Sequence, residues 1–165
     1  IMNRLWAPWR MDYITKPKRK GCVFCIKSDS DLDKENLVLF RGQFSFLLLN
    51  LYPYSNGHLM VAPYDHTSNI SKIDKDTASE IMSISNYSMI ALKKELKAQG
   101  FNFGANLGKV AGAGIADHIH YHIVPRWEGD TNFMPVVGQT KVIMESLIET
   151  WKNLKPYFNG PKNLI

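Results

Sequence analysis

The stretch that decides the fold is residues 118–124, with the sequence HIHYHIV. Its three histidines alternate with apolar and aromatic residues, and a period of two is that of a β-strand. On such a strand the imidazoles of His118, His120 and His122 share one face, at spacings of roughly 6.6 Å for a rise of about 3.3 Å per residue. The intervening side chains face the other way, into a core: Ile119, Tyr121 and Ile123.

Three interpretations of this histidine row are open from the residues alone. The first is a solvated or hydrogen-bonded polar face, and the second is a three-histidine metal site. Three ligands from one strand are too far apart to converge easily on one ion. The third is a catalytic row, because histidine acts as nucleophile, proton carrier or metal ligand near neutral pH. Triple alternation is not usual in a core, and the nearby Arg126 and Trp127 add a cation and a flat aromatic ring, so the third interpretation is favoured.

A loop of small residues leads into the histidines. Asn106 is followed by residues 111–114, with the sequence AGAG. Such a loop allows a substrate oxyanion to approach backbone N–H groups closely, as in anion-binding nests. A flexible hairpin connection is the alternative, but the neighbouring histidines favour phosphate binding.

These motifs carry a resemblance to a known family. Residues 106–133 resemble the signature of the histidine triad (HIT) family of nucleotidyl hydrolases and transferases. A second block, residues 46–63 (FLLLNLYPYSNGHLMVAP), resembles the strand, turn and Gly-His of that family. Two further pieces, 5–10 (LWAPWR) and 125–134 (PRWEGDTNFM), are similar to the bacterial diadenosine tetraphosphate phosphorylase or hydrolase branch. The resemblance covers most of the chain.

The resemblance implies roles for the three histidines. His120 is expected to attack the α-phosphorus and form a nucleotidyl-histidine intermediate, which splits one difficult transfer into two steps. The attacking imidazole must be neutral, and a backbone carbonyl on the neighbouring strand is expected to hold its remote N–H. His122 is expected to contact the transferring phosphate or the leaving oxygen, and His118 to border the site.

The resemblance also implies a set of nucleotide-binding residues: Asn50, His58, Asn106, Gly112, Gly114 and Trp127. Asn50 is expected to hold the ribose hydroxyls, and His58 to support the triad. Asn106 and the two glycine backbones are expected to stabilise charge on the phosphoryl oxygens. Many family members place Gln, Ser or Thr where this chain has Gly114. Backbone N–H groups and water therefore replace that donor, or turnover is weaker, or a different leaving group is preferred.

The chain has only two cysteines, Cys22 and Cys25, in the spacing Cys-x-x-Cys. A redox pair, a local disulfide and half of a zinc site are all open readings of this spacing. The preceding residues 16–21 (KPKRKG) do not look like the strand of a thioredoxin-like motif. The related galactose-1-phosphate uridylyltransferases bind zinc through a comparable set, which here implies a structural Zn²⁺ on four residues: Cys22, Cys25, His66 and His118.

Composition is consistent with a polyanionic substrate. The 165 residues carry a formal charge of +5, and a basic protein suits phosphate-rich partners. Four of the positive charges cluster in residues 16–20, so nucleic acid stays open as a partner, although a solvated face is the simpler explanation. No stretch has the roughly 20 apolar residues that cross a bilayer. Two cysteines without a disulfide framework favour the cytoplasm.

The predicted architecture is one α+β domain over residues 1–165, with an N-terminal arm (1–36) and a HIT-like core and C-terminal helix (37–165). Five antiparallel strands are expected at 37–41, 44–49, 58–62, 101–107 and 118–125. Helices are expected at 74–99, with Gly100 as its C-terminal cap, and at 142–157. Helical spacing predicts the buried face of the first: Ala78, Ile81, Met82, Ser85, Met89, Leu92 and Leu96. The family resemblance implies a homodimer with joined sheets and helices packed across the interface.

The sequence therefore predicts an enzyme that cleaves dinucleoside polyphosphates, with diadenosine tetraphosphate phosphorolysis as the leading activity. A hydrolase of the same substrates and a purine nucleoside phosphoramidate hydrolase are alternatives with the same histidine chemistry. An alternative of another class is a zinc-stabilised nucleotide- or RNA-binding module with little turnover.

Overall fold

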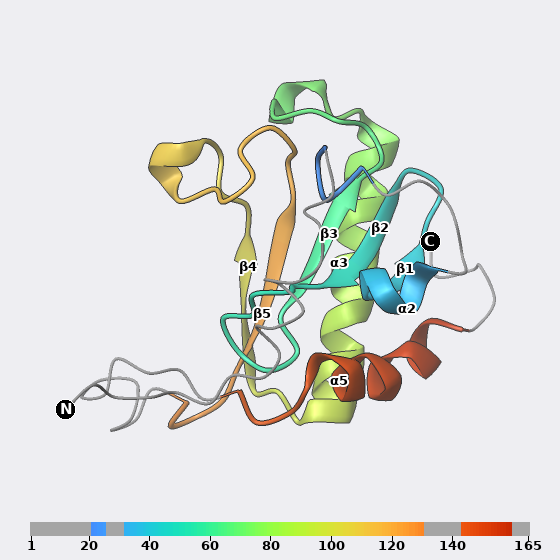
Figure 1. Cartoon of the computed structure of the whole chain (residues 1–165), viewed down its shortest axis with the longest axis vertical. Helices are drawn as coiled ribbons and strands as arrows, with labels where there is room; N and C mark the ends of the chain where they lie inside the picture. The colour runs from blue at the N-terminus through green and yellow to red at the C-terminus, as the bar shows by residue number, and fades with distance from the viewer. Residues whose placement is uncertain (1–20, 26–31, 131–142, 160–165) are drawn as a thin grey trace.

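The computed structural model describes residues 21–25, 32–130 and 143–159. Its centre is one five-stranded sheet with the long helix against one face (Figure 1). This arrangement confirms the predicted α+β class with a five-stranded antiparallel sheet. Within the described ranges, no helix is both long enough and apolar enough to cross a membrane.

All five predicted strands are present, with ends shifted by a few residues. They are β1 (Val38–Arg41), β2 (Ser45–Leu49), β3 (Leu59–Pro63), β4 (Gly100–Gly104) and β5 (Tyr121–Arg126). The spatial order is β1-β2-β3-β5-β4, and every neighbouring pair is antiparallel. Strand β4 therefore forms one edge of the sheet, and β5 lies between β3 and β4.

The longest helix of the described residues is α3 (Lys75–Leu96), which lies between β3 and β4 in the sequence. It begins where predicted, because the Asp74 side chain accepts a hydrogen bond from the Thr77 backbone N–H and caps the first turn. The prediction that Gly100 ends it is wrong. Lys97 adopts the left-handed conformation at the C-cap, with φ of 54°, and Gly100 is the first residue of β4.

The buried face of α3 matches the predicted one only in part: Ile81, Ser85 and Leu92 are buried as expected. Met82, predicted to be in the core, is 56% exposed, and Ala78 is exposed as well. The buried face instead carries Glu80, which is 2% exposed. Its carboxylate accepts hydrogen bonds from the β1–β2 turn, namely from the backbone N–H groups of Gln43 and Phe44 and the hydroxyl of Ser45. Hydrophobic spacing does not reveal a core face that includes a fully paired carboxylate.

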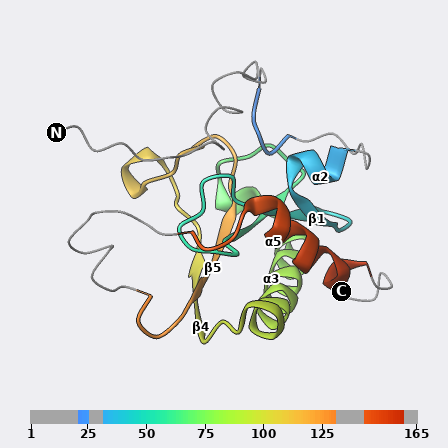
Figure 2. The same cartoon turned by 60° about the horizontal axis from the view of Figure 1, so that its bottom comes forward.

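The C-terminal helix is shorter than predicted. Helix α5 (Leu147–Leu154) starts after an N-cap at Ser146 rather than at residue 142, and the 3₁₀ turn η4 (Lys155–Phe158) extends it. It lies across the end of the sheet near α3 (Figure 2). The Trp151 indole N–H donates to the Val38 carbonyl, and the Lys155 ammonium donates to the Leu39 carbonyl. These two bonds satisfy carbonyls of the β1 edge strand.

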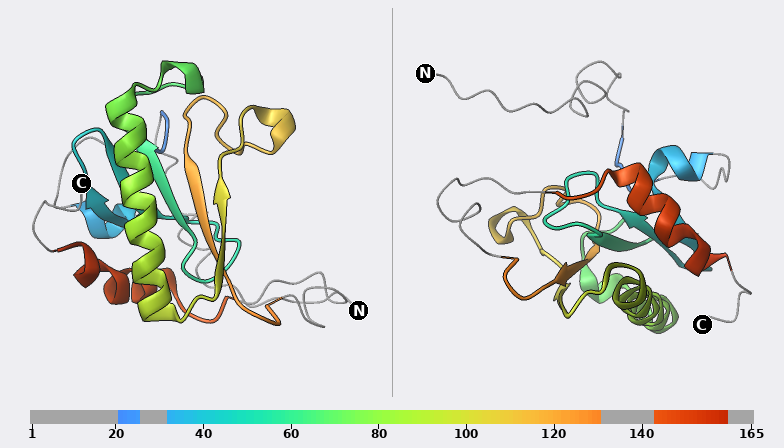
Figure 3. Two further views of the ribbon diagram at one scale, coloured as in Figure 1. Left: turned by 180° about the vertical axis from the view of Figure 1, so that it is seen from behind. Right: turned by 90° about the horizontal axis from the view of Figure 1, so that it is seen from below.

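Apolar clusters cover both faces of the sheet. The main core fills the space under α3 and α5 and includes Leu47, Leu49 and Ile123. A second cluster lies on the other face: Phe24, Val38, Phe46, Leu48, Met60 and Ala62. Figure 3 shows residues 21–25 and α3 on opposite sides of the sheet. Strand β2 is apolar at nearly every position because successive residues serve the two clusters. The remaining short helices are α2 (Asp33–Asn36), η2 (Ile70–Lys72) and η3 (Lys109–Ala111).

Candidate functional site

The histidines gather at the start of β5, but they do not all lie on the strand. Strand β5 begins at Tyr121, so His118 and His120 precede it in an irregular segment. The Ile119 backbone N–H in that segment donates to the Thr67 carbonyl at 2.7 Å. The ring centroids of His120 and His122 are 4.9 Å apart, so these two rings are in contact.

His120 is held by a short main-chain contact. Its Nδ1 lies 2.9 Å from the carbonyl oxygen of His118, and a carbonyl accepts only, so Nδ1 carries the proton. The other ring nitrogen, Nε2, is then left with a lone pair, as a neutral nucleophile requires. The acceptor is the carbonyl two residues earlier in the same segment, not one on a neighbouring strand as the sequence analysis expected.

A relay of two hydrogen bonds, from the Tyr54 backbone through His58 to His122, fixes the tautomers of His58 and His122. The backbone N–H of Tyr54 donates to Nδ1 of His58 at 3.0 Å, which places the His58 proton on Nε2. That Nε2 lies 2.9 Å from Nδ1 of His122 and donates to it. The His122 proton is therefore on Nε2. A backbone amide thus determines that His122 presents a donor, whereas His120 presents an acceptor.

His122 is neutral at physiological pH. Burial lowers its pKa to about 4, and the neighbouring charge of His120 acts in the same direction. A neutral imidazole with its proton on Nε2 can donate a hydrogen bond to an anionic oxygen without becoming charged.

Asn50 lies beside this relay. Its side-chain oxygen accepts from the Tyr52 backbone N–H at 2.9 Å, and its Nδ2 lies 3.2 Å from Nδ1 of His58. The side chain is 9% exposed. Part of its amide is therefore engaged in holding His58, while its ribose-binding role stays a prediction.

Asn106 and Gly112 lie near each other in the small-residue loop, whereas Trp127 lies against the main core. Nδ2 of Asn106 would lie 4.0 Å from a Cβ on Gly112, so these two predicted residues are neighbours. The Gly112 N–H, however, donates to the Lys109 carbonyl inside the loop. Gly114 is exposed, and space around its Cα is open. Trp127 packs against the main core, and its indole N–H donates to the Leu96 carbonyl. The structure therefore does not bring Trp127 to the histidines.

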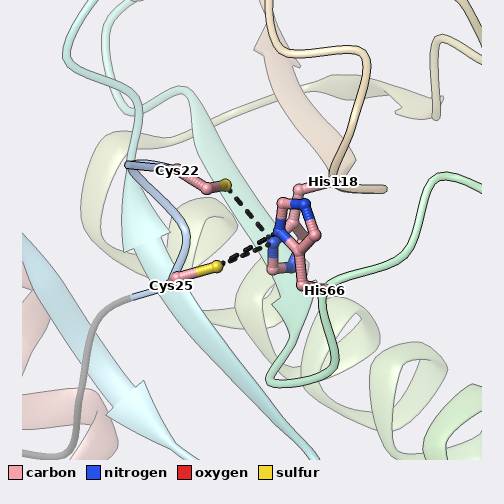
Figure 4. Close-up of side chains that lie close together, drawn as sticks. All are labelled: Cys22, Cys25, His66 and His118. Carbon is pink, nitrogen blue, oxygen red and sulfur yellow. Dashed lines mark hydrogen bonds between the residues drawn. The ribbon is translucent and has the colours of Figure 1, made fainter. Parts of the chain in front are cut away.

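The four predicted metal ligands come together from three separate segments. One ligand atom from each of Cys22, Cys25, His66 and His118 lies within 4.8 Å of every other (Figure 4). The Cys25 sulfur lies 3.2 Å from Nδ1 of His66, and the Cys22 sulfur lies 3.4 Å from Nδ1 of His118. Both cysteines are free thiols. These four side chains could hold a metal ion.

His118 is oriented for that role. Its Nε2 lies 3.0 Å from the carbonyl of Pro63 and donates to it, which leaves the Nδ1 lone pair directed at the sulfurs. The imidazole is fully buried. Burial lowers the pKa of His118, and the charge of His66 adds to this effect. A neutral imidazole is the form that binds a metal.

Two aromatic residues of the site were missed by the sequence analysis. The Phe24 ring stacks on His120 with centroids 4.5 Å apart, and the Tyr54 ring stacks on His122 at 5.7 Å. Both lie within motifs that the sequence analysis quoted, Phe24 between the cysteines and Tyr54 in the turn before Gly-His. In the sequence, each is marked only by its place: Phe24 precedes the proposed metal ligand Cys25, and Tyr54 lies four residues before His58.

Comparisons with known proteins identify the family. The HIT domain model matches residues 32–129. The chain is 38% identical over 157 residues to the AP-4-A phosphorylase of Mycobacterium tuberculosis (strain H37Rv), across 90% of this chain and 80% of that protein. It is 27% identical over 106 residues to the adenosine 5′-monophosphoramidase of Saccharomyces cerevisiae, across 64% of this chain and 63% of that protein.

Solved structures show the same fold. A hypothetical histidine triad nucleotide-binding protein from Sulfolobus tokodaii is 27% identical with a TM-score of 0.64, across 82% of this chain and 91% of that chain. A zinc-bound histidine triad family protein from Mycobacterium smegmatis is 24% identical, also with a TM-score of 0.64 and the same coverage. Family model, relatives and fold agree: this chain belongs to the histidine triad family.

Proposed function

We propose that this protein cleaves dinucleoside polyphosphates, with diadenosine tetraphosphate as the leading substrate, through a nucleotidyl group carried on His120. The observation that supports it most directly is the bond from His120 Nδ1 to the His118 carbonyl, because it leaves Nε2 as the free nucleophilic nitrogen. The identity of 38% to an AP-4-A phosphorylase supports the substrate class.

In the first step, the Nε2 lone pair of His120 attacks the α-phosphorus, and the bond from that phosphorus to the bridging oxygen breaks. The departing nucleotide leaves with that oxygen. The Nε2–H of His122 faces the developing charge and donates a hydrogen bond to it, because the relay from Tyr54 through His58 fixes that tautomer. In the second step, an oxygen nucleophile attacks the same phosphorus and His120 is released.

The identity of the second nucleophile separates two activities. Inorganic phosphate gives a nucleoside diphosphate, whereas water gives a monophosphate. We favour phosphate, since the similarity to a phosphorylase covers 90% of this chain. Water and phosphate differ by small changes in site geometry, so the hydrolase is the nearest rival.

A second candidate is phosphoramidate hydrolysis, which uses the same histidines with a nitrogen leaving group. One observation favours it, the similarity to an adenosine 5′-monophosphoramidase. A nucleotide- or RNA-binding module with little turnover is the rival of another class. It predicts salt-sensitive oligonucleotide binding that His120→Ala leaves unchanged.

Product analysis decides among these functions. The purified protein is incubated with diadenosine tetraphosphate, with and without inorganic phosphate, beside His120→Ala. We expect ADP plus ATP that depends on phosphate and is lost in the variant. AMP plus ATP regardless of phosphate identifies a hydrolase. If neither product pair forms while adenosine 5′-phosphoramidate is cleaved, the second candidate is correct. If no substrate is cleaved, or if His120→Ala cleaves as fast as the parent, the proposed mechanism is wrong.

We propose Zn²⁺ as the metal held by Cys22, Cys25, His66 and His118. Two thiolates and two imidazoles are a donor set that zinc prefers, and four protein ligands leave no open position. The ion would supply a structural cross-link among the N-terminal segment, the segment after β3 and the segment before β5. All chemistry at phosphorus stays with His120 and His122. Metal analysis of protein purified without added metal tests the assignment, and a folded, active protein without metal would contradict it.

We also propose that two copies associate along β4 and α3. Strand β4 is an edge of the sheet, and its Phe103 is 38% exposed. On α3, Met82 and Ile90 are 56% and 54% exposed. Among the described strands β4 pairs with β5 alone, and an edge strand and a helix that both expose apolar side chains suit a second copy, with the two sheets joined into one.

A further inference from the structure

The ring of Phe24 lies directly against the ring of His120. The two centroids are 4.5 Å apart with an interplanar angle of 29°, and the Phe24 ring also meets His118 at 5.3 Å. Phe24 is 2% exposed and His120 is 6% exposed. Phe24 therefore has almost no surface to offer a bound nucleotide. Its contact with the site is with the imidazole itself.

Phe24 occupies a position between two metal ligands. Cys22 and Cys25 flank it, and the Cys25 backbone N–H closes a turn onto the Cys22 carbonyl at 3.1 Å. An ion bound by both sulfurs, as in the arrangement of Figure 4, would fix the backbone on either side of Phe24. The ring itself is buried in the second cluster, which also contains Phe46 and Met60.

His120 needs such a contact. Its one hydrogen bond given by the described residues, from Nδ1 to the His118 carbonyl, holds one edge of the ring. The His122 ring meets it edge-on, with centroids 4.9 Å apart. Neither contact covers the ring face on which Phe24 stacks, and a stacked aromatic ring opposes tilting because offset stacking favours a narrow range of ring orientations. Phe24 therefore adds a face contact to the hydrogen bond and the edge contact in directing Nε2.

We propose that Phe24 is a positioning residue for His120, and that it makes the orientation of this nucleophile depend on occupancy of the Cys22–Cys25–His66–His118 site. The kinetic part of this proposal rests on the proposed function. The structural part, a metal-dependent stack of Phe24 on His120, does not need it.

Kinetics of Phe24→Leu test the positioning role, with Phe46→Leu as the matched control. Phe46 belongs to the same cluster and is fully buried, but it stacks on Tyr64 rather than on a histidine. Misplacement of a nucleophile by about 1 Å costs up to roughly a hundredfold in rate. We expect kcat of Phe24→Leu to fall about ten- to a hundredfold with KM within about twofold. Phe46→Leu should keep kcat near the parent value. Equal losses in both variants, or an unchanged kcat in Phe24→Leu, would overturn the role.

Histidine-selective NMR of the metal-loaded protein gives a readout that does not depend on catalysis. The ring current of Phe24 should shift the carbon-bound ring protons of His120 upfield. Phe24→Leu should remove this shift, and Phe46→Leu should preserve it. Chelation of the metal from the unmodified chain should move the His120 signals toward their positions in Phe24→Leu.

The two experiments separate failure of this proposal from failure of the proposed function. If the chain cleaves no dinucleotide but the His120 signals respond to Phe24→Leu and to chelation, the stack and its metal dependence stand and the activity is wrong. If the His120 signals do not change on chelation, the proposed dependence of the stack on the metal is wrong, whatever the activity. Because chelation uses the unmodified chain, this outcome is reached even if Phe24→Leu does not fold.

Discussion

The main-chain carbonyl of His118 accepts a hydrogen bond from Nδ1 of His120 at 2.9 Å. The side chain of the same His118 lies beside the cysteines of the proposed metal site, with its Nδ1 3.4 Å from the Cys22 sulfur. One residue therefore belongs to both parts of the site. Its imidazole is one of the four proposed metal ligands, and its backbone fixes the tautomer of the proposed nucleophile.

The relay through His58 predicts a loss of activity without a loss of fold. His58→Phe keeps a ring of similar size but removes the donor to His122. Residues that orient a reacting or ligating histidine typically contribute about ten- to a hundredfold, so we expect kcat to fall by that factor. His58→Gln retains a donor and should lose less. Initial rates with circular dichroism as the check on fold measure this, and equal losses in the two variants would argue against the relay.

The lowered pKa of His122 predicts how stability depends on pH. Its pKa is about 4 in the folded chain against 6.5 in the unfolded chain. Between these values the unfolded state binds more protons, so the free energy of unfolding falls as pH falls from 6.5 to about 4 and is unaffected above that window. The free energy of unfolding, measured by urea denaturation at several pH values, should depend less steeply on pH in His122→Gln than in the parent. The same dependence on pH in both proteins would mean that His122 does not titrate in this way.

Gly57 is predicted to be intolerant of a side chain. Its φ is +73°, and a Cβ there would overlap Cδ1 of Leu96. The left-handed backbone costs about 1–2 kcal/mol and the overlap with the Leu96 side chain about 1–3 kcal/mol, so Gly57→Ala should lower the free energy of unfolding by about 2–5 kcal/mol. Gly104→Ala, where nothing lies within 4 Å of the new Cβ, is the matched control and should unfold like the parent. Chemical denaturation measures both.

Metal removal is predicted to lower thermal stability. A ligand present at 100 to 1,000 times its Kd stabilises the folded state by about 3–4 kcal/mol, which corresponds to a Tm change of roughly 10 °C in a chain of this size. A chelator should lower Tm by about that amount in the parent. Cys25→Ser removes one ligand and should start at a lower Tm that the chelator barely changes. A parent Tm indifferent to the chelator would refute the structural role.

If two copies associate along β4 and α3, a charged substitution should disrupt the dimer on that face and not elsewhere on the surface. Ile90→Glu places a charge on the exposed stripe of α3, whereas Val110→Glu alters an exposed apolar residue in the loop before β5. Light scattering during gel filtration should give a dimer for the parent and for Val110→Glu, and a monomer for Ile90→Glu. A monomeric parent would contradict the association.

The five strands were predicted to within a few residues, and α3 begins where predicted, with the structure showing Asp74 as its N-cap. The C-terminal helix was predicted to begin too early, at residue 142 rather than at Leu147. The resemblance carried by the histidine and cysteine motifs also named four side chains that do converge into a cluster that could hold a metal ion. Local patterns were reliable wherever a residue's environment follows from its immediate neighbours along the chain.

Other features could not be found in this way. The buried carboxylate of Glu80 on the core face of α3 was not predicted, because its partners lie in the distant β1–β2 turn. Trp127 was predicted in the site, and its ring is partly buried against the main core, with its indole N–H donating to the Leu96 carbonyl. Hydrophobicity alone does not say which of two apolar faces a residue joins.

The sequence by itself therefore determined the elements, the family motifs and the side chains available for chemistry. Only the tertiary structure decided which nitrogen of each histidine is protonated and which ring stacks on His120. The physical reason is that tautomers are set by hydrogen-bond partners and ring planes by packing. For His122 the tautomer is set by two successive hydrogen bonds through His58 that end at the Tyr54 backbone N–H, 68 residues earlier in the sequence (122 − 54). For His120 the packing partner is Phe24, brought across the sheet face by the fold.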